Sequence, residues 1–306
     1  MPTGKIPHCV ATLNPKLRDN HYPNKELTGV GVAFKLACAV LEALKIESPE
    51  MQRDMTPLLD LVALGTITDV GTLLGENRTL VRHGLKEIRM GRRLGVRALC
   101  LFAGVQPAEV TSTDVVLRIA PKLNSLGRLA DASIGVALLL AEDKKTIEEI
   151  LCHVDQVNRE RQQIEAQVFH DVNKVIVEQP KIIEQAAIVL SSANWHARII
   201  PIVASRLAKT YNKPVVIISD QHGIGRGSLR TIGSFPLLGI LQKCSSLFIS
   251  YGGHDFAAGI VIQSEKIEDF KKKFIHLVHS SIKKEEHFCN IPNNPKHTQH
   301  LSLIHI

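Results

Sequence analysis

Apolar residues recur every three or four positions over two stretches in the first quarter of the chain. Over residues 28 to 45 this spacing predicts an amphipathic helix. A second helix is predicted to begin with Thr56 as its N-cap and Pro57 at its first helical position, and to stop near Gly65. Each of these helices would bury one apolar face.

Three further helices are predicted between the second helix and residue 180. Asn77 is predicted to cap a helix with a basic outer face, which is usually solvated but could also guide a strand of DNA. Residues 132 to 140 are apolar enough for a buried helix that closes a first domain. From 143 to 179 apolar residues recur at helical spacing, which predicts one helix about 50 Å long. Their spacing is too irregular for the heptads of a coiled coil.

The second half of the chain alternates strands with helices. Short apolar runs at 187–191 and 214–219 suit buried strands, and a helix from about 198 to 210 is predicted between them. A further strand at 258–263 and a closing helix at 267–278 complete the pattern. This order predicts an α/β fold with a mixed sheet.

Two glycine-rich turns stand between these strands. In the first (GIGRGSLR, 223–230), the glycines, Gly227 among them, let the backbone approach a ligand closely. Ser228 and Arg230 lie two residues apart, on one face of an extended segment, and a hydroxyl beside a guanidinium suits a phosphate. On spacing alone, an ordinary hairpin with an exposed arginine explains this segment equally well.

In the second turn (YGGHDFAAG, 251–259), Gly252 and Gly253 are predicted to deliver His254 to the start of a new element. A histidine there can donate to an oxyanion or accept a proton. A hairpin turn with a structural histidine is the alternative.

Composition narrows the class of protein. A chain of 306 residues with 44% hydrophobic residues is long enough for two domains with separate cores. It has neither an apolar run of bilayer length nor a signal-peptide pattern, so no membrane association and a cytoplasmic location are expected. Six scattered cysteines favour reduced core thiols over disulfides or a zinc site. The net charge of +7 permits a polyanionic partner without proving one.

Together the two glycine turns resemble the core of the DHH-associated domain of DHH phosphoesterases. Four more segments, in the same order, resemble the RecJ family of single-stranded-DNA-specific exonucleases: residues 14–36, 61–81, 121–129 and 194–207. The resemblance implies a remnant of a DHH phosphoesterase domain joined by a long helix to a smaller DHH-associated α/β domain with a mixed sheet. The implied segments are residues 1–141, 142–180 and 181–283, followed by a disordered or artefactual tail, 284–306.

The resemblance implies a 5′ to 3′ exonuclease of DNA repair and recombination that hydrolyses phosphodiesters with two Mn²⁺ or Mg²⁺ ions. Asp69 matches a metal ligand of the family, and a carboxylate just past a helix end is a suitable oxygen donor for a hard cation. As an isolated residue, Asp69 would be read as a turn or capping residue. In the motif NSLGRL (124–129), Arg128 matches an arginine that reaches the scissile or a neighbouring phosphate, and Asn124 is expected to act with it. Without the resemblance, this motif would be read as a loop with a salt bridge.

The same resemblance implies a pocket for a 5′-terminal phosphate in the second domain. The expected lining is Gly227, Ser228, Arg230, Gly252 and Gly253, with His254 as a supporting and catalytic residue. Further contacts are expected from Trp195, His196 and Arg206. Trp195 fits a core position as well as a base-stacking one. Arg198 and Pro201 occupy glycine positions of the family motif, a departure that affects the local backbone shape.

The family motifs with two metal-binding histidines and further aspartates have no match in the chain, nor has the family's oligonucleotide-binding barrel. His8, Cys9 and His21 are not expected to replace the missing ligands. An internal fragment, monomeric and inactive by itself, is therefore expected. Single-stranded DNA is the implied substrate, with single-strand-binding protein and a helicase as implied partners.

Two alternatives stay open. One is a DHH phosphoesterase acting on short oligonucleotides or cyclic dinucleotides, which would be expected to lack the long helix and the NSLGRL motif. The other is a non-catalytic nucleic-acid-binding module, because the DHH-associated fold also occurs in aminoacyl-tRNA synthetases.

Overall fold

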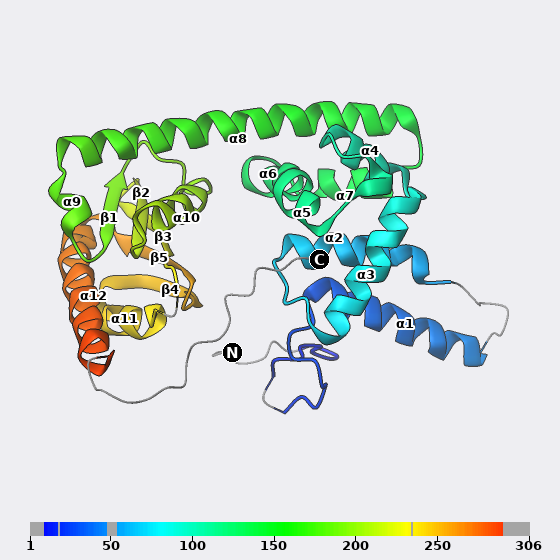
Figure 1. Cartoon of the computed structure of the whole chain (residues 1–306), viewed down its shortest axis with the longest axis horizontal. Coiled ribbons are helices and arrows are strands. Elements are labelled where there is room, and N and C mark those ends of the chain that lie inside the picture. The colour runs from blue at the N-terminus through cyan, green and yellow to red at the C-terminus, as the bar shows by residue number, and fades with distance from the viewer. Residues whose placement is uncertain (1–8, 18, 48–53, 234, 290–306) are drawn as a thin grey trace. The chain divides into compact units, whose positions relative to one another are not determined.

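The structure, a computed structural model, describes residues 9–17, 19–47, 54–233 and 235–289 (Figure 1). The chain divides into two compact units, Met1–Arg161 and Gln162–Ile306. The division falls within α8 (Lys144–Glu178), a helix of 35 residues. The single long helix predicted from 143 to 179 is thus confirmed.

The described part of the first unit is helical. Its main core is contributed by α2, α3, α4, α7 and the start of α8, and Leu99, Val110 and Val115 in it are fully buried. The helices that precede α8 are α1 (Gly29–Glu47), α2 (Leu59–Thr68), α3 (Gly75–Met90), α4 (Leu94–Phe102), α5 (Ser112–Asp114), α6 (Ala120–Leu129) and α7 (Ser133–Leu140). α1 and α7 confirm two of the predicted helices, although Leu36 and Val40 on α1 are about half exposed. The prediction that 132–140 is a buried helix is wrong: Val136 and Leu140 are mostly exposed, and only Gly135 and Leu138 of α7 are buried.

The second predicted helix differs from its prediction at both ends. Thr56 is not an N-cap: it opens a 3₁₀ turn (Thr56–Leu58), and its backbone N–H donates to the side chain of Asp54 at 2.9 Å. α2 also continues past Gly65 to Thr68. Gly65 lies inside the helix because Val30 of α1 packs against it; an added Cβ would stand 2.9 Å from a methyl group of Val30.

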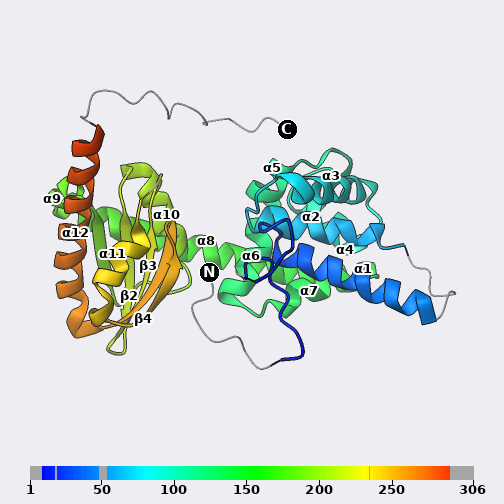
Figure 2. The same cartoon turned by 90° about the horizontal axis from the view of Figure 1, so that it is seen from below.

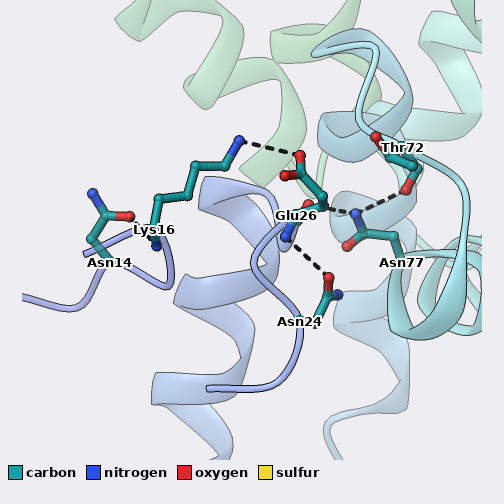
Figure 3. Close-up of polar contacts among 6 residues, drawn as sticks. All are labelled: Asn14, Lys16, Asn24, Glu26, Thr72 and Asn77. Carbon is teal, nitrogen blue, oxygen red and sulfur yellow. Dashed lines mark hydrogen bonds and ion pairs between the residues drawn. The ribbon is translucent and has the colours of Figure 1, made fainter. Parts of the chain in front are cut away.

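Asn77 does not cap α3 either. The helix begins two residues earlier, at Gly75, and Asn77 is buried inside its first turn. Its side-chain Nδ2 donates to the backbone oxygens of Glu26 at 2.7 Å and Thr72 at 3.0 Å (Figure 3). The carboxylate of Glu26 pairs with Lys16 at 3.2 Å. Asn77 therefore ties the loop before α1 to the start of α3 through the two hydrogen bonds of its amide nitrogen.

The second unit is built on a five-stranded sheet in the order β1-β2-β3-β5-β4. The strands are β1 (Ile188–Ser192), β2 (Val215–Gln221), β3 (Ile224–Arg230), β4 (Phe248–His254) and β5 (Ala257–Gln263). β1 and β2 are parallel, and the other pairs are antiparallel. His222 and Gly223 join β2 to β3 and both have positive φ, which is the geometry of a type I′ hairpin. The predicted mixed sheet is confirmed.

Helices cover both faces of this sheet (Figure 2). α11 (Leu237–Lys243) and α12 (Ile267–Cys289) pack on one face. α10 (Ile200–Tyr211), α9 (Lys181–Glu184) and the second half of α8 pack on the other. α12 reaches Cys289, so the prediction of a disordered tail from residue 284 is wrong for 284–289, and 290–306 lie outside the described residues.

Five cysteines have side chains that the structure describes, and all five are free thiols. Cys100 and Cys244 are buried, whereas Cys9 and Cys152 are exposed. Burial raises the pKa of Cys100 to about 11, so this thiol stays protonated at neutral pH. The expectation of unpaired cysteines is confirmed for these residues, although not all of them lie in a core.

None of the helices within the described ranges is both long enough and apolar enough to span a bilayer.

Candidate functional site

Strand β3 presents two different faces. Gly225, Gly227 and Leu229 point into the core beneath α11 and α12; a Cβ added to Gly227 would lie 2.6 Å from Ile260. Because side chains alternate along a strand, Arg226, Ser228 and Arg230 lie on the opposite face, the one that α10 covers. The glycines at 225 and 227 are therefore explained by close packing of the core.

On that opposite face, a row of positions without bulky side chains crosses three strands. Ser228 of β3 pairs with Gly259 of β5, which pairs with Gly252 of β4. A Cβ added to Gly252 would meet no atom within 4 Å, and one added to Gly259 would meet only the backbone oxygen of Gly227, at 3.9 Å. The sheet backbone is therefore open to a ligand along this row.

This open row forms the floor of a groove of about 780 Å³. The first turn of α10 and the residues before it form a wall, through Ala197, Arg198, Ile200 and Pro201. The lining residues include the guanidinium groups of Arg198, Arg226 and Arg230, and no carboxylate is among those that the structure describes. A groove with this lining favours an anionic ligand.

Arg230 is held in a fixed orientation at the edge of the groove. Its Nε donates to Ser205 Oγ at 3.1 Å, and its Nη1 donates to Ser228 Oγ at 2.9 Å and to the backbone oxygen of Leu229 at 2.7 Å. Ser205 in turn donates to the backbone oxygen of Pro201 at 2.9 Å, one turn earlier in α10. Helix α10 thus positions the guanidinium through Ser205.

Ser228 is 6% exposed and accepts a hydrogen bond from Arg230. Its own hydroxyl proton has no acceptor within the described part of the chain. A buried hydroxyl of this kind gains most from a ligand that supplies the missing acceptor. A phosphate oxygen fits the requirement, because the adjacent guanidinium contributes charge and the hydroxyl contributes a donor.

Five of the residues predicted to bind a phosphate line this one groove: Gly227, Ser228, Arg230, Gly252 and Gly253. The two segments, however, are mostly strands and not turns. His254 is the last residue of β4 and not the start of a new element, and it is exposed. Its Nδ1 accepts a hydrogen bond from the backbone N–H of Phe256 at 3.3 Å, and it is not among the lining residues.

Three other predicted contacts lie elsewhere. Trp195 is 2% exposed and belongs to the core with α10, so its ring cannot stack on a base. His196 lies in the turn before α10: its backbone oxygen accepts from the N–H groups of Ile199 and Ile200, and its side chain is outside the groove lining. Arg206 stacks on Phe169 of α8, 4.1 Å from the ring centre, which holds it away from the groove.

Arg226 and Arg198 line the groove but were absent from the predicted site. The signal for Arg226 was present in the sequence, since Arg226, Ser228 and Arg230 stand at alternating positions of one strand. Arg198 had no such signal, because its place depends on how α10 packs against the sheet.

In the first unit, Asp69 stands at the end of α2 as its C-cap residue, with an exposed side chain. The backbone N–H of Val70 donates to Ile67, and that of Gly71 donates to Thr66, both at 3.0 Å. This pattern is a Schellman motif, whose left-handed position is usually glycine. Here it is Val70, with φ of 54°. A β-branched residue in that conformation is strained, and the strain adjoins the predicted metal ligand.

Replacing Val70 with glycine is expected to raise the free energy of unfolding by about 1 kcal/mol, because glycine adopts this conformation without strain. Urea denaturation followed by circular dichroism would measure the change. A loss of stability would mean that contacts of the valine side chain outweigh its backbone strain.

The NSLGRL motif is helical, contrary to the loop expected there without the family resemblance. It occupies the second half of α6, so Asn124 and Arg128 lie four residues apart on one helix face. Gly127 has no atom within 4 Å of an added Cβ, so the fold does not require a glycine at this position. A common role of Asn124, Arg128 and Asp69 stays a prediction.

A protein metal site needs several ligands. Among the described side chains, no group of three or more histidine, cysteine, aspartate or glutamate residues is placed to hold a metal ion. The described residues therefore do not form a complete two-metal site around Asp69.

Comparisons with known proteins agree on one family. A model of the DHHA1 domain matches residues 182–280. The single-stranded-DNA-specific exonuclease RecJ of Haemophilus influenzae is 38% identical over 285 residues, which are 90% of this chain and 50% of that protein. The RecJ of Bacillus subtilis is 34% identical over 287 residues, 93% of this chain and 35% of that protein. The chain thus spans between about a third and a half of these relatives.

A solved structure extends the agreement to the fold. A crystal structure of exonuclease RecJ bound to manganese superposes with a TM-score of 0.70 at 30% identity, over 91% of this chain and 67% of that one. The matched domain, residues 182–280, contains the whole of strand β3, which lines the groove, and both glycine-rich segments, 223–230 and 251–259. As the ordered motifs of its sequence indicated, the chain belongs to the RecJ family.

Proposed function

We propose that this chain is the part of a single-stranded-DNA-specific 5′ to 3′ exonuclease that holds the 5′-phosphate end of the strand. The observation that carries the proposal is the pair formed by Ser228 and Arg230 at the groove floor, joined by a hydrogen bond of 2.9 Å. Names of the relatives support the substrate class, since they are single-stranded-DNA-specific exonucleases. The proposed biological setting is DNA repair and recombination.

In this proposal the terminal phosphate lies on the open row of Ser228, Gly259 and Gly252. Ser228 donates its hydroxyl proton to a phosphate oxygen, and Arg230 supplies a fixed positive charge. A fixed guanidinium binds more tightly than a mobile one, because less side-chain entropy is lost when the ligand arrives. The glycines matter because they let the strand backbone approach the sugar and phosphate.

For the hydrolytic step we propose divalent metal ions, Mn²⁺ or Mg²⁺, in line with the manganese named for the solved relative. Such ions would polarise the phosphate and activate water. Asp69 is one oxygen donor for them, and Arg128 with Asn124 would steady neighbouring phosphates. Because the described residues do not form a complete metal site, the chain by itself is proposed to be inactive.

Single-stranded DNA is the proposed partner. Single-strand-binding protein, a helicase, a monomeric state and a cytoplasmic location are predictions that rest on the family alone.

The proposal is tested by fluorescence anisotropy with one single-stranded oligonucleotide carrying either a 5′-phosphate or a 5′-hydroxyl end. The wild-type chain is expected to bind the phosphorylated end more tightly. Arg230→Ala is expected to weaken that binding about tenfold or more, because a hydrogen bond to a charged group contributes about 1.5–3 kcal/mol. The preference for the phosphate is expected to vanish with it.

Two control variants separate the effect of positive charge from the effect of the guanidinium geometry of Arg230. Arg230→Lys keeps the charge but cannot make the paired contacts to Ser205 and Ser228, so it is expected to restore only part of the affinity. Lys209→Ala removes an exposed positive charge at the other end of α10 and is expected to change little. Equal binding of the two ends by the wild type would reject the proposal.

The binding-module alternative predicts a different outcome from the same assay. A module that recognises RNA would bind an RNA strand of the same sequence more tightly than DNA, with no dependence on the 5′ end.

A further inference from the structure

Arg226 is a groove residue to which the proposed phosphate site assigns no role. It lines the groove, is exposed, and stands on β3 between Ser219 of β2 and Val261 of β5. Within the described residues its guanidinium makes no hydrogen bond, ion pair or ring contact. An arginine that lines an open groove without a partner is available to a ligand, whereas Arg230 is already held by Ser205 and Ser228.

The position of Arg226 relative to Ser228 gives the direction in which the site extends. Two residues of a strand span about 7 Å. That length is comparable with the step from one phosphate to the next in an extended nucleic-acid strand. A strand whose terminal phosphate lies at Ser228 can therefore present its second phosphate to Arg226.

We propose that Arg226 binds the second phosphate of the bound strand, so that the groove selects a 5′-phosphorylated oligonucleotide over a mononucleotide. The inference rests on the proposed function, because it takes the terminal phosphate to lie at Ser228 and Arg230. The proposal gives Arg226 a role of its own, which is to select ligands by their length. It also explains why the groove lining continues along β3 past the Ser228 and Arg230 pair.

The test compares two ligands, thymidine 5′-monophosphate and the 5′-phosphorylated thymidine trinucleotide, by calorimetric titration of the whole chain. For the wild type, the trinucleotide is expected to bind more tightly. Arg226→Ala is expected to weaken the trinucleotide about tenfold and to leave the mononucleotide unchanged. Arg230→Ala is expected to weaken both ligands. Because Arg226 has no partner in the described fold, its variant should melt at the wild-type temperature.

The dependence of affinity on salt concentration gives a second measurement. It would not change if Arg226 had only a structural role. Loss of one phosphate contact lowers the slope of log affinity against log salt by about 0.7 for a single strand. Arg226→Ala is expected to show this loss with the trinucleotide, and Lys209→Ala is expected to show none.

The outcomes separate the inference from the proposal on which it rests. If Arg226→Ala weakens the mononucleotide as much as the trinucleotide, or weakens neither, the second-phosphate assignment is wrong while the terminal site stands. If Arg230→Ala changes neither ligand, the terminal site is wrong, and the assignment of Arg226 fails with it.

Discussion

Replacing Gly84 with alanine is expected to destabilise the first unit by about 3 kcal/mol or more. Gly84 lies in α3 where that helix crosses α2, and an added Cβ would stand 2.0 Å from the backbone oxygen of Leu59 and 2.5 Å from the Cβ of Ala63. A backbone oxygen cannot move aside as a flexible side chain can. The two helices would have to separate and open the core that they share. Urea denaturation with circular dichroism would measure the loss.

Gly127 provides the matched control for this prediction. It is also a helical glycine of the first unit, but an added Cβ meets nothing within 4 Å. Gly127→Ala is expected to be neutral or to stabilise by about 0.5–1 kcal/mol, since alanine restricts the unfolded chain and favours helix. If the two variants unfolded at the same urea concentration, the close packing of α2 and α3 described above would be wrong.

Replacing Gly259 with valine is expected to abolish binding of a 5′-phosphorylated strand while leaving the fold intact. The added side chain would project from the groove floor beside Ser228, its partner in the register of β3 and β5. Its Cβ has room, since the nearest atom is 3.9 Å away, and a β-branched residue suits a strand. Affinity is expected to fall by more than tenfold in the anisotropy assay, with an unchanged melting temperature.

Two other glycines of the second unit serve as controls for this variant. Gly253→Ala is expected to lower stability itself, because Gly253 has a φ of 143° and an added Cβ would stand 2.3 Å from the backbone oxygen of Ala257. Gly239→Ala, on α11 and away from the groove, is expected to leave the affinity unchanged and to be neutral or slightly stabilising. Wild-type affinity in a folded Gly259→Val variant would exclude the open glycine row as the binding surface.

Hydrophobic spacing predicted most of the helices and strands, and it failed where a tertiary contact decided the local structure. Helix α2 continues past Gly65 because that glycine admits Val30, and Asn77 enters α3 because its amide bonds two loop carbonyls. Neither contact can be recognised from the residues that neighbour Gly65 or Asn77 in the sequence. The helical form of NSLGRL was missed because its glycine and polar residues are equally typical of a loop.

By itself the sequence determined the family, the order of the elements and the pairing of Ser228 with Arg230, because these follow from local spacing and from motifs that occur in a fixed order. Only the tertiary structure decided which candidates share a groove. It buried Trp195, turned Arg206 onto Phe169 and added Arg226 to the lining. The reason is physical: strand register aligns Ser228 with Gly259 and Gly252, and register depends on pairing between segments far apart in the chain.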